Sequence, residues 1–127
     1  MTFPFQPQQG LILVLAEIEG PLGTVGLRLA LDTGATATLV EPRLLLMAGI
    51  DPTLAPVQIQ LTTASGVLLA SLLTVTKLKA LGQDRPLFPI LAHTLPASTS
   101  IDGLLGLDFF RGQRLLIDFR NGTITLT

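Results

Sequence analysis

Residues 25–36 read VGLRLALDTGAT, and this stretch decides the fold. It places one carboxylate, Asp32, on a tight glycine turn directly after an apolar run with the composition of a buried strand. Burying an ionised carboxylate is costly unless the group gains a partner, so an acid at this place needs a physical explanation. In the simplest one, Asp32 caps its own loop, which is a common role for Asp before Gly.

The composition bounds what the chain can do. A length of 127 residues predicts one domain with a single core. Eight basic and nine acidic residues give a net charge of -1, and the basic residues are scattered, which argues against a nucleic-acid partner. Hydrophobic residues make up 48% of the chain and charged residues 13%, so a single copy would expose much apolar surface. Self-association would hide that surface.

The sequence gives no sign of a metal centre or a membrane anchor. Cysteine is absent and His93 is the single histidine, so we expect no disulfide, no metal site and no cofactor. No run approaches the roughly 20 apolar residues that span a bilayer, and the first residues do not fit a secretory signal. We therefore expect a soluble, cytoplasmic protein without a membrane partner.

The pattern along the chain is mainly that of short strands. Residues 1–10 contain two prolines and three glutamines and predict a flexible or extended arm, followed by one domain over residues 11–127. The elements predicted within that domain are a hairpin over 11–31, a short strand at 38–40, a short helix near 42–48, a hairpin over 57–79, a strand at 86–92, a loop at 95–100, an apolar segment at 103–111 that can turn into a short helix, and a hairpin over 115–126 around Asn121-Gly122. Together they predict an all-β fold, a small closed β-barrel with one or two short helices.

Three motifs occur in an informative order. Asp32-Thr33-Gly34-Ala35 follows the apolar strand, Ala64-Ser65-Gly66 forms a hairpin tip, and Leu104-Leu105-Gly106 comes later. In these motifs and their order the chain resembles the retropepsin-like aspartic peptidases, most closely the cellular and bacterial single-domain type. The resemblance covers nearly the whole chain, from about residue 11 to 126. The order and spacing of the three motifs are more specific than any one motif alone.

The resemblance implies a homodimeric aspartic endopeptidase that acts on extended polypeptide. Asp32 of each copy would supply one carboxylate of a catalytic pair, Thr33 would hydrogen-bond across the dimer axis, and Gly34 would let the backbone approach the substrate. The residues implied in substrate binding are Ala35 and Thr36 beside the acid, and Ala64, Ser65 and Gly66 at the tip of a flap. The resemblance also assigns Leu104, Leu105 and Gly106 a structural role behind the catalytic loop.

One pair of positions departs from the viral members of this family. Those members usually carry an Asp and an Arg, which interact, where this chain has Thr36 and Leu107. Both charges are missing together, so no orphan charge remains. Substrate contacts typical of the viral enzymes are therefore not carried over to this chain.

Other interpretations stay open at the level of sequence. The chain could be a non-catalytic dimeric module for binding or assembly that keeps the same fold, or a monomeric scaffold domain. The hairpin tip could be an ordinary exposed turn. Among the remaining polar residues, we expect Asp102 in a turn, Asp108 and Asp118 as caps or pairs at the surface, and His93 in a loop.

Overall fold

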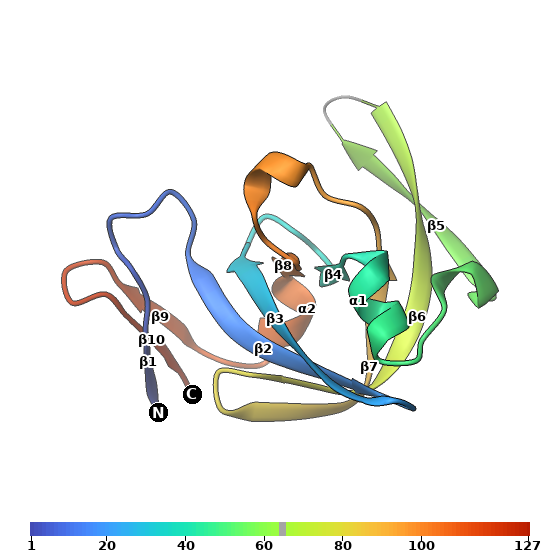
Figure 1. Cartoon of the computed structure of the whole chain (residues 1–127). Coiled ribbons are helices and arrows are strands. Elements are labelled where there is room, and N and C mark those ends of the chain that lie inside the picture. The colour runs from blue at the N-terminus through green and yellow to red at the C-terminus, as the bar shows by residue number, and fades with distance from the viewer. Residues whose placement is uncertain (64–65) are drawn as a thin grey trace.

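The computed structural model describes residues 1–63 and 66–127, and these residues form strands of very different length with a few helical turns (Figure 1). The strands are β1 (Thr2–Pro4), β2 (Leu13–Gly20), β3 (Gly23–Leu31), β4 (Leu39–Val40), β5 (Val57–Thr63), β6 (Gly66–Ala80), β7 (Gln83–Ala92), β8 (Gly103–Leu105), β9 (Leu115–Asp118) and β10 (Thr123–Leu126). The helical elements are α1 (Pro42–Met47), α2 (Leu107–Phe110) and the 3-10 turns η1 (Pro52–Leu54) and η2 (Ala97–Thr99).

The larger sheet closes into a barrel. Its strands follow the order β2-β3-β8-β4-β7-β6-β5, and a further pairing joins β2 to β6, so that all of these strands except β5 form a ring. The closing pairing is antiparallel and places Ala16 opposite Ala80 and Glu19 opposite Lys77. The structure confirms the predicted closed all-β barrel with two short helices. Closure removes most free strand edges, which would otherwise pair with other chains.

The core fills the inside of this ring. Along β2, Val14, Ala16 and Ile18 are buried while Leu15 and Glu17 between them are exposed, as expected for a strand with one face toward the interior. Burial of a large apolar side chain contributes about 1.5–3 kcal/mol, so the filled barrel provides most of the stabilisation. The large apolar side chains that are fully buried are Ile18, Leu29, Val40, Leu45, Val75, Leu78, Ile90, Leu105, Phe109 and Ile124.

Helix α1 lies where the sequence predicts it. Pro42 occupies its first turn, and Gly49 just beyond its end has a φ of +87°, a left-handed conformation that favours glycine. The helix buries Leu44 and Leu45 against the core. No helix in residues 1–63 or 66–127 is long and apolar enough to cross a membrane.

The N-terminal segment takes part in a second sheet. Residues 1–10 were expected to form a flexible or extended arm, and within them β1 pairs antiparallel with β10, which in turn pairs with β9. The apolar residues of the segment explain why it joins this sheet. Phe5 is buried, and its ring packs edge to face on Phe119 with 5.5 Å between the ring centroids. In Figure 1 both ends of the chain lie beside this small sheet.

The predicted Asn121-Gly122 hairpin is also present, and Asp118 caps it. The Asp118 carboxylate accepts hydrogen bonds from the backbone N–H groups of Arg120 and Asn121 at 2.9 and 3.0 Å. The bond from the Asn121 backbone is the main cause of a lowered pKa for Asp118. A lowered pKa in the folded state stabilises the fold above the unfolded pKa, and this contribution is lost as the pH falls through the folded value.

We predict that the core depends on Phe109. Its side chain is fully buried, its ring lies 4.9 Å from the guanidinium of Arg85, and it packs edge to face on Phe110. Phe109→Ala should therefore lower the free energy of unfolding by about 3–5 kcal/mol, measured by urea denaturation.

A matched control for this prediction is Phe119→Ala. Phe119 is 61% exposed, so its removal should cost no more than about 1.5 kcal/mol, the value of one aromatic pair. Equal losses for the two variants would show that the core does not depend on Phe109 as described.

Candidate active site

The turn that carries Asp32 lies over the end of an inserted strand. Strand β8 runs between β3 and β4, parallel to β3 with Leu31 opposite Leu105, and antiparallel to β4 with Leu39 opposite Leu104. Because β3 and β4 are consecutive in the chain, the loop of residues 32–38 that joins them must cross the end of β8. The topology alone therefore places Asp32 beside the Leu-Leu-Gly motif.

Two backbone hydrogen bonds fix this loop to the end of β8 and to the segment that follows it. The N–H of Asp32 donates to the carbonyl of Leu105 at 3.0 Å, and the N–H of Leu107 donates to the carbonyl of Ala35 at 2.8 Å. Both bonds join groups about 70 positions apart in the sequence, so the turn is held by tertiary structure and not only by its own residues. The Asp32 carboxylate is therefore presented at a fixed position.

Gly106 is required for this close approach. A Cβ atom at this position would lie 2.6 Å from the carbonyl carbon of Ala37 and 2.9 Å from the carbonyl oxygen of Ala35. Both distances are far below a normal contact, and both neighbours are backbone atoms that cannot move aside. The structural role expected for the Leu-Leu-Gly motif follows from this packing.

The carboxylate of Asp32 has one oxygen engaged locally. Its Oδ1 accepts a hydrogen bond from the N–H of Gly34 at 2.9 Å, and the N–H of Ala35 donates to the backbone carbonyl of Asp32 at 3.2 Å. Asp32 thus does cap its own turn, as the simplest interpretation predicts. No hydrogen bond to Oδ2 is found within the described part of the chain, so that oxygen can still engage another group.

The turn faces outward in a single copy of the chain. Asp32 and Ala35 are half-buried, whereas Thr33, Gly34 and Thr36 are exposed. The expected site residues 32–36 are thus contiguous on one accessible turn. A single copy presents one carboxylate here, half-buried and flanked by small exposed residues.

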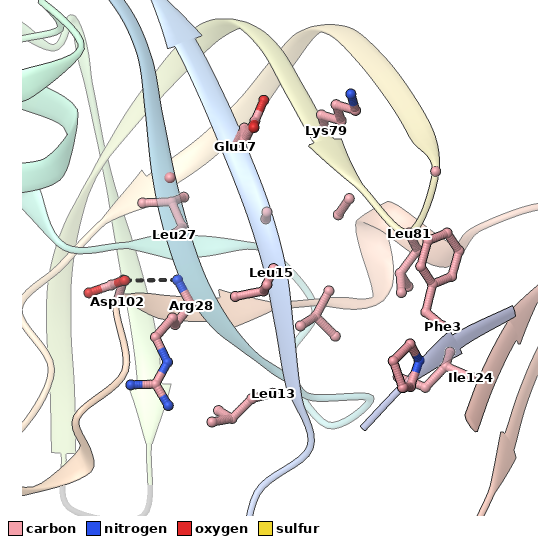
Figure 2. Close-up of a pocket in the computed structure, with 16 residues that line it drawn as sticks. Phe3, Leu13, Leu15, Glu17, Leu27, Arg28, Lys79, Leu81, Asp102 and Ile124 are labelled. Atoms are coloured by element: carbon pink, nitrogen blue, oxygen red, sulfur yellow. Dashed lines mark hydrogen bonds between the residues drawn. The ribbon is translucent and has the colours of Figure 1, made fainter. Parts of the chain in front are cut away.

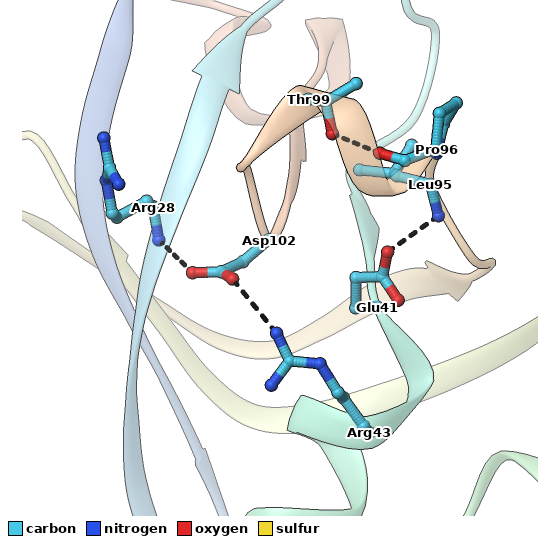
Figure 3. Close-up of polar contacts among 7 residues, drawn as sticks. All are labelled: Arg28, Glu41, Arg43, Leu95, Pro96, Thr99 and Asp102. Atoms are coloured by element: carbon cyan, nitrogen blue, oxygen red, sulfur yellow. Dashed lines mark hydrogen bonds and ion pairs between the residues drawn. The ribbon is translucent and has the colours of Figure 1, made fainter.

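Asp102 does not supply a second acid at this turn. Its Oδ2 accepts a hydrogen bond from the backbone N–H of Arg28 at 2.8 Å, and Oδ1 lies 3.8 Å from the guanidinium of Arg43 (Figure 3). Arg28 precedes Asp32 by four residues on β3, a distance of about 13 Å along an extended strand. Asp102 therefore serves as a turn and pairing residue.

The expected flap corresponds to the β5–β6 hairpin. These two strands pair antiparallel from Val57 opposite Leu72 to Thr63 opposite Gly66, and they project from the barrel on the same side as the β3–β4 connection (Figure 1). Gly66 is the first residue of β6. Ala64 and Ser65, the other two expected tip residues, lie outside the described residues.

A buried polar cluster behind the turn was not anticipated from the sequence. Thr38 is fully buried, and its backbone N–H and its Oγ1 hydroxyl donate to the two carboxylate oxygens of Asp108 at 3.0 and 2.7 Å. The same hydroxyl oxygen accepts a hydrogen bond from the N–H of Gly106 at 3.1 Å. Asp108 thus acts as a cap and pairing residue, as expected, but it is half-buried and not at the surface, and it binds the far end of the Asp32 loop.

Metal-binding groups do not gather in the described part of the chain. No cluster of three or more His, Cys, Asp or Glu side chains that could hold an ion occurs within residues 1–63 and 66–127. His93 follows β7 and donates its backbone N–H to the carbonyl of Val40 at 3.3 Å. The reactive group at the turn is the carboxylate of Asp32, and a carboxyl group can accept or donate a proton.

Comparisons with known proteins agree with this geometry. The model of the family described as "Aspartyl protease" matches residues 14–109. A crystal structure of a retropepsin-like aspartic protease from Rickettsia conorii superposes with a TM-score of 0.75, at 18% sequence identity, over 99% of this chain and 88% of that one. No curated protein matches the chain significantly. The retropepsin-like fold expected from the sequence is confirmed.

We predict that Asp108 stabilises the loop through Thr38. Asp108→Ala would leave the buried N–H and hydroxyl of Thr38 without acceptors, so it should lower the free energy of unfolding by about 1–3 kcal/mol in urea denaturation. The control is Asp84→Ala, because Asp84 is exposed, and a surface change of this kind costs within about 0.5 kcal/mol. A loss for Asp108→Ala no larger than that of the control would contradict the assignment.

Proposed function

The chain belongs to the aspartyl protease family, and on that premise we propose that it is an aspartic endopeptidase whose catalytic pair forms from the Asp32 residues of two copies. The observation that carries the proposal is the Asp32 turn, fixed over the end of β8 with one carboxylate oxygen left for another group. The family and the fold support a protease-type function. The catalytic pair, the dimer and the activity are the proposal.

The need for a second copy follows from the chemistry. Hydrolysis of a peptide bond by carboxylates requires two of them close enough to share one proton. The chain brings Asp32 to the outward turn, while Asp102 and Asp108 are bound elsewhere. A two-fold axis beside the turn would place two Asp32 side chains face to face and cover the exposed Thr33 and Gly34 of each copy.

In such a pair the two carboxyl groups take different roles. The ionised Asp32 removes a proton from a water molecule, and that water attacks the carbonyl carbon of the scissile bond. The protonated Asp32 of the second copy donates to the carbonyl oxygen, and the amide nitrogen then receives a proton as the bond breaks. The attacking group is water, so no acyl-enzyme forms.

The substrate would bind between the turn and the flap. An extended polypeptide can use backbone hydrogen bonds that do not depend on its sequence. Ala35 and Thr36 would contact it from the turn, and the hairpin tip of Ala64, Ser65 and Gly66 would close over it. Neither a metal nor a cofactor has a part in this reaction.

The first prediction of this proposal concerns Asp32 itself. Asp32→Asn keeps the size of the side chain but cannot accept the proton from water, so kcat/KM for an unfolded protein substrate at mildly acidic pH should fall at least about 100-fold. Asp84→Asn is the control, because Asp84 is an exposed acid outside the turn and its substitution should leave cleavage unchanged. Cleavage that persists in Asp32→Asn would refute the catalytic role.

The second prediction concerns the shared site. When wild type and Asp32→Asn are unfolded together in equal amounts and refolded, about one quarter of the dimers receive two intact acids, so the activity should fall to about one quarter. If each chain carried a complete site, the mixture would instead retain half of the wild-type activity.

Light scattering on the same samples measures whether the chain is dimeric. A protein with no cleavage at all, but a dimer mass, would be a binding or assembly module instead.

A further inference from the structure

The edge of β2 is only partly covered. Strand β2 pairs with β3 along its whole length, but β6 joins its other edge only from Ala16 onward. Leu13, Val14 and Leu15 therefore have a neighbouring strand on one side only, within the part of the chain that the structure describes. The pairing that closes the barrel therefore leaves a short part of the β2 edge without a partner strand among the described residues.

The backbone of two of these residues points away from β3. The N–H of Leu31 donates to the carbonyl of Ile12 at 2.8 Å, which fixes the phase of the β2–β3 ladder. Hydrogen-bonded pairs alternate along antiparallel strands, so Val14 bonds to β3, while the N–H and C=O groups of Leu13 and Leu15 face the open edge. Such groups are a template for a further strand.

A groove of about 750 Å³ lies along this edge (Figure 2). The small sheet forms its opposite wall with Phe3 and Ile124, and the turn between β6 and β7 closes one end with Leu81. Leu15 is 79% exposed although its neighbours Val14 and Ala16 are buried. The groove thus combines an apolar lining with unpaired backbone groups.

The charges around the groove indicate what kind of partner fits. Its charged lining residues are Glu17 and Lys79 on the β6 side of β2, and Arg28 and Asp102 on its β3 side, so that each side carries one acid and one base. The Asp102 carboxylate is held by the Arg28 backbone, and Lys79 stands directly opposite Glu17 in the strand register. A strongly charged partner would therefore gain little, and an uncharged apolar segment matches the lining best.

We propose that this groove binds an extended, uncharged segment of a partner polypeptide, which adds as a strand to β2 at Leu13–Leu15. Backbone hydrogen bonds would provide the affinity, and apolar side chains at alternate positions would pack on Leu13 and Leu15. Across the groove, Pro4 has no N–H to donate and blunts the edge of β1. The edge of β2 is therefore the surface that pairs. The proposal does not depend on proteolysis.

The test uses a synthetic peptide of alternating Val and Thr, six residues long and blocked at both ends, with the full-length Asp32→Asn chain so that the probe stays intact. Amide exchange followed by NMR should slow at least about tenfold at Leu13 and Leu15 on saturation, and stay unchanged at Val14, which already bonds to β3. A protection pattern confined to other strands would overturn the proposal.

Variants of the chain and a modified peptide make the test more specific. Leu15→Asp should weaken peptide binding at least about tenfold, because a charge replaces the apolar contact, while Leu54→Asp should leave binding unchanged. The two side chains are matched in exposure, at 79% and 78%, and Leu54 lies outside the groove. A peptide with N-methyl groups on the residues that face β2 should lose binding, because it cannot donate to the edge.

Three further results would overturn the proposal. Binding of the N-methylated peptide as tight as that of the parent would show that no strand is added. Equal affinity of Leu15→Asp and Leu54→Asp would place the peptide elsewhere. Protection of Leu13 and Leu15 that grows with protein concentration in the absence of peptide would show that a second copy of the chain occupies the edge.

Discussion

The insertion of β8 between β3 and β4 is the constraint on which the rest of the structure depends. It forces the connection of residues 32–38 across the end of β8, where hydrogen bonds to Leu105 and Leu107 hold it. Gly106 is needed because no side chain fits against this connection. The position of the Asp32 turn thus follows from the order of the strands, and its bonds to β8 and to the residues after it fix the turn to the barrel.

Local patterns in the sequence were sufficient to predict most elements of the fold. The hairpins, helix α1 and the Asn121-Gly122 turn all follow from alternation and from Gly and Pro at turns. The role of Asp108 could not be predicted in this way, because its partner Thr38 lies 70 positions away and neither residue belongs to a local pattern. The pairing of β1 with β10 could not be predicted either, because the prolines and glutamines around β1 are typical of an arm without regular structure.

The composition also predicted more apolar surface than a single copy can bury. Large apolar side chains are indeed exposed, but they lie on separate elements, as with Leu15 on β2, Leu22 between β2 and β3, and Leu54 on η1. The composition therefore indicated that apolar side chains would stay exposed on the folded chain, but not on which elements. Only the pairing of strands showed that one such residue borders an unpaired edge.

The buried bonds between Thr38 and Asp108 have a consequence for the order of events during synthesis. The first half of the chain can form its hairpins early, since their partners are near in sequence. The Asp32 turn stays unanchored until residues 103–108 have left the ribosome and folded against it. The position of the Asp32 carboxylate is therefore completed only by the last quarter of the chain, late in synthesis.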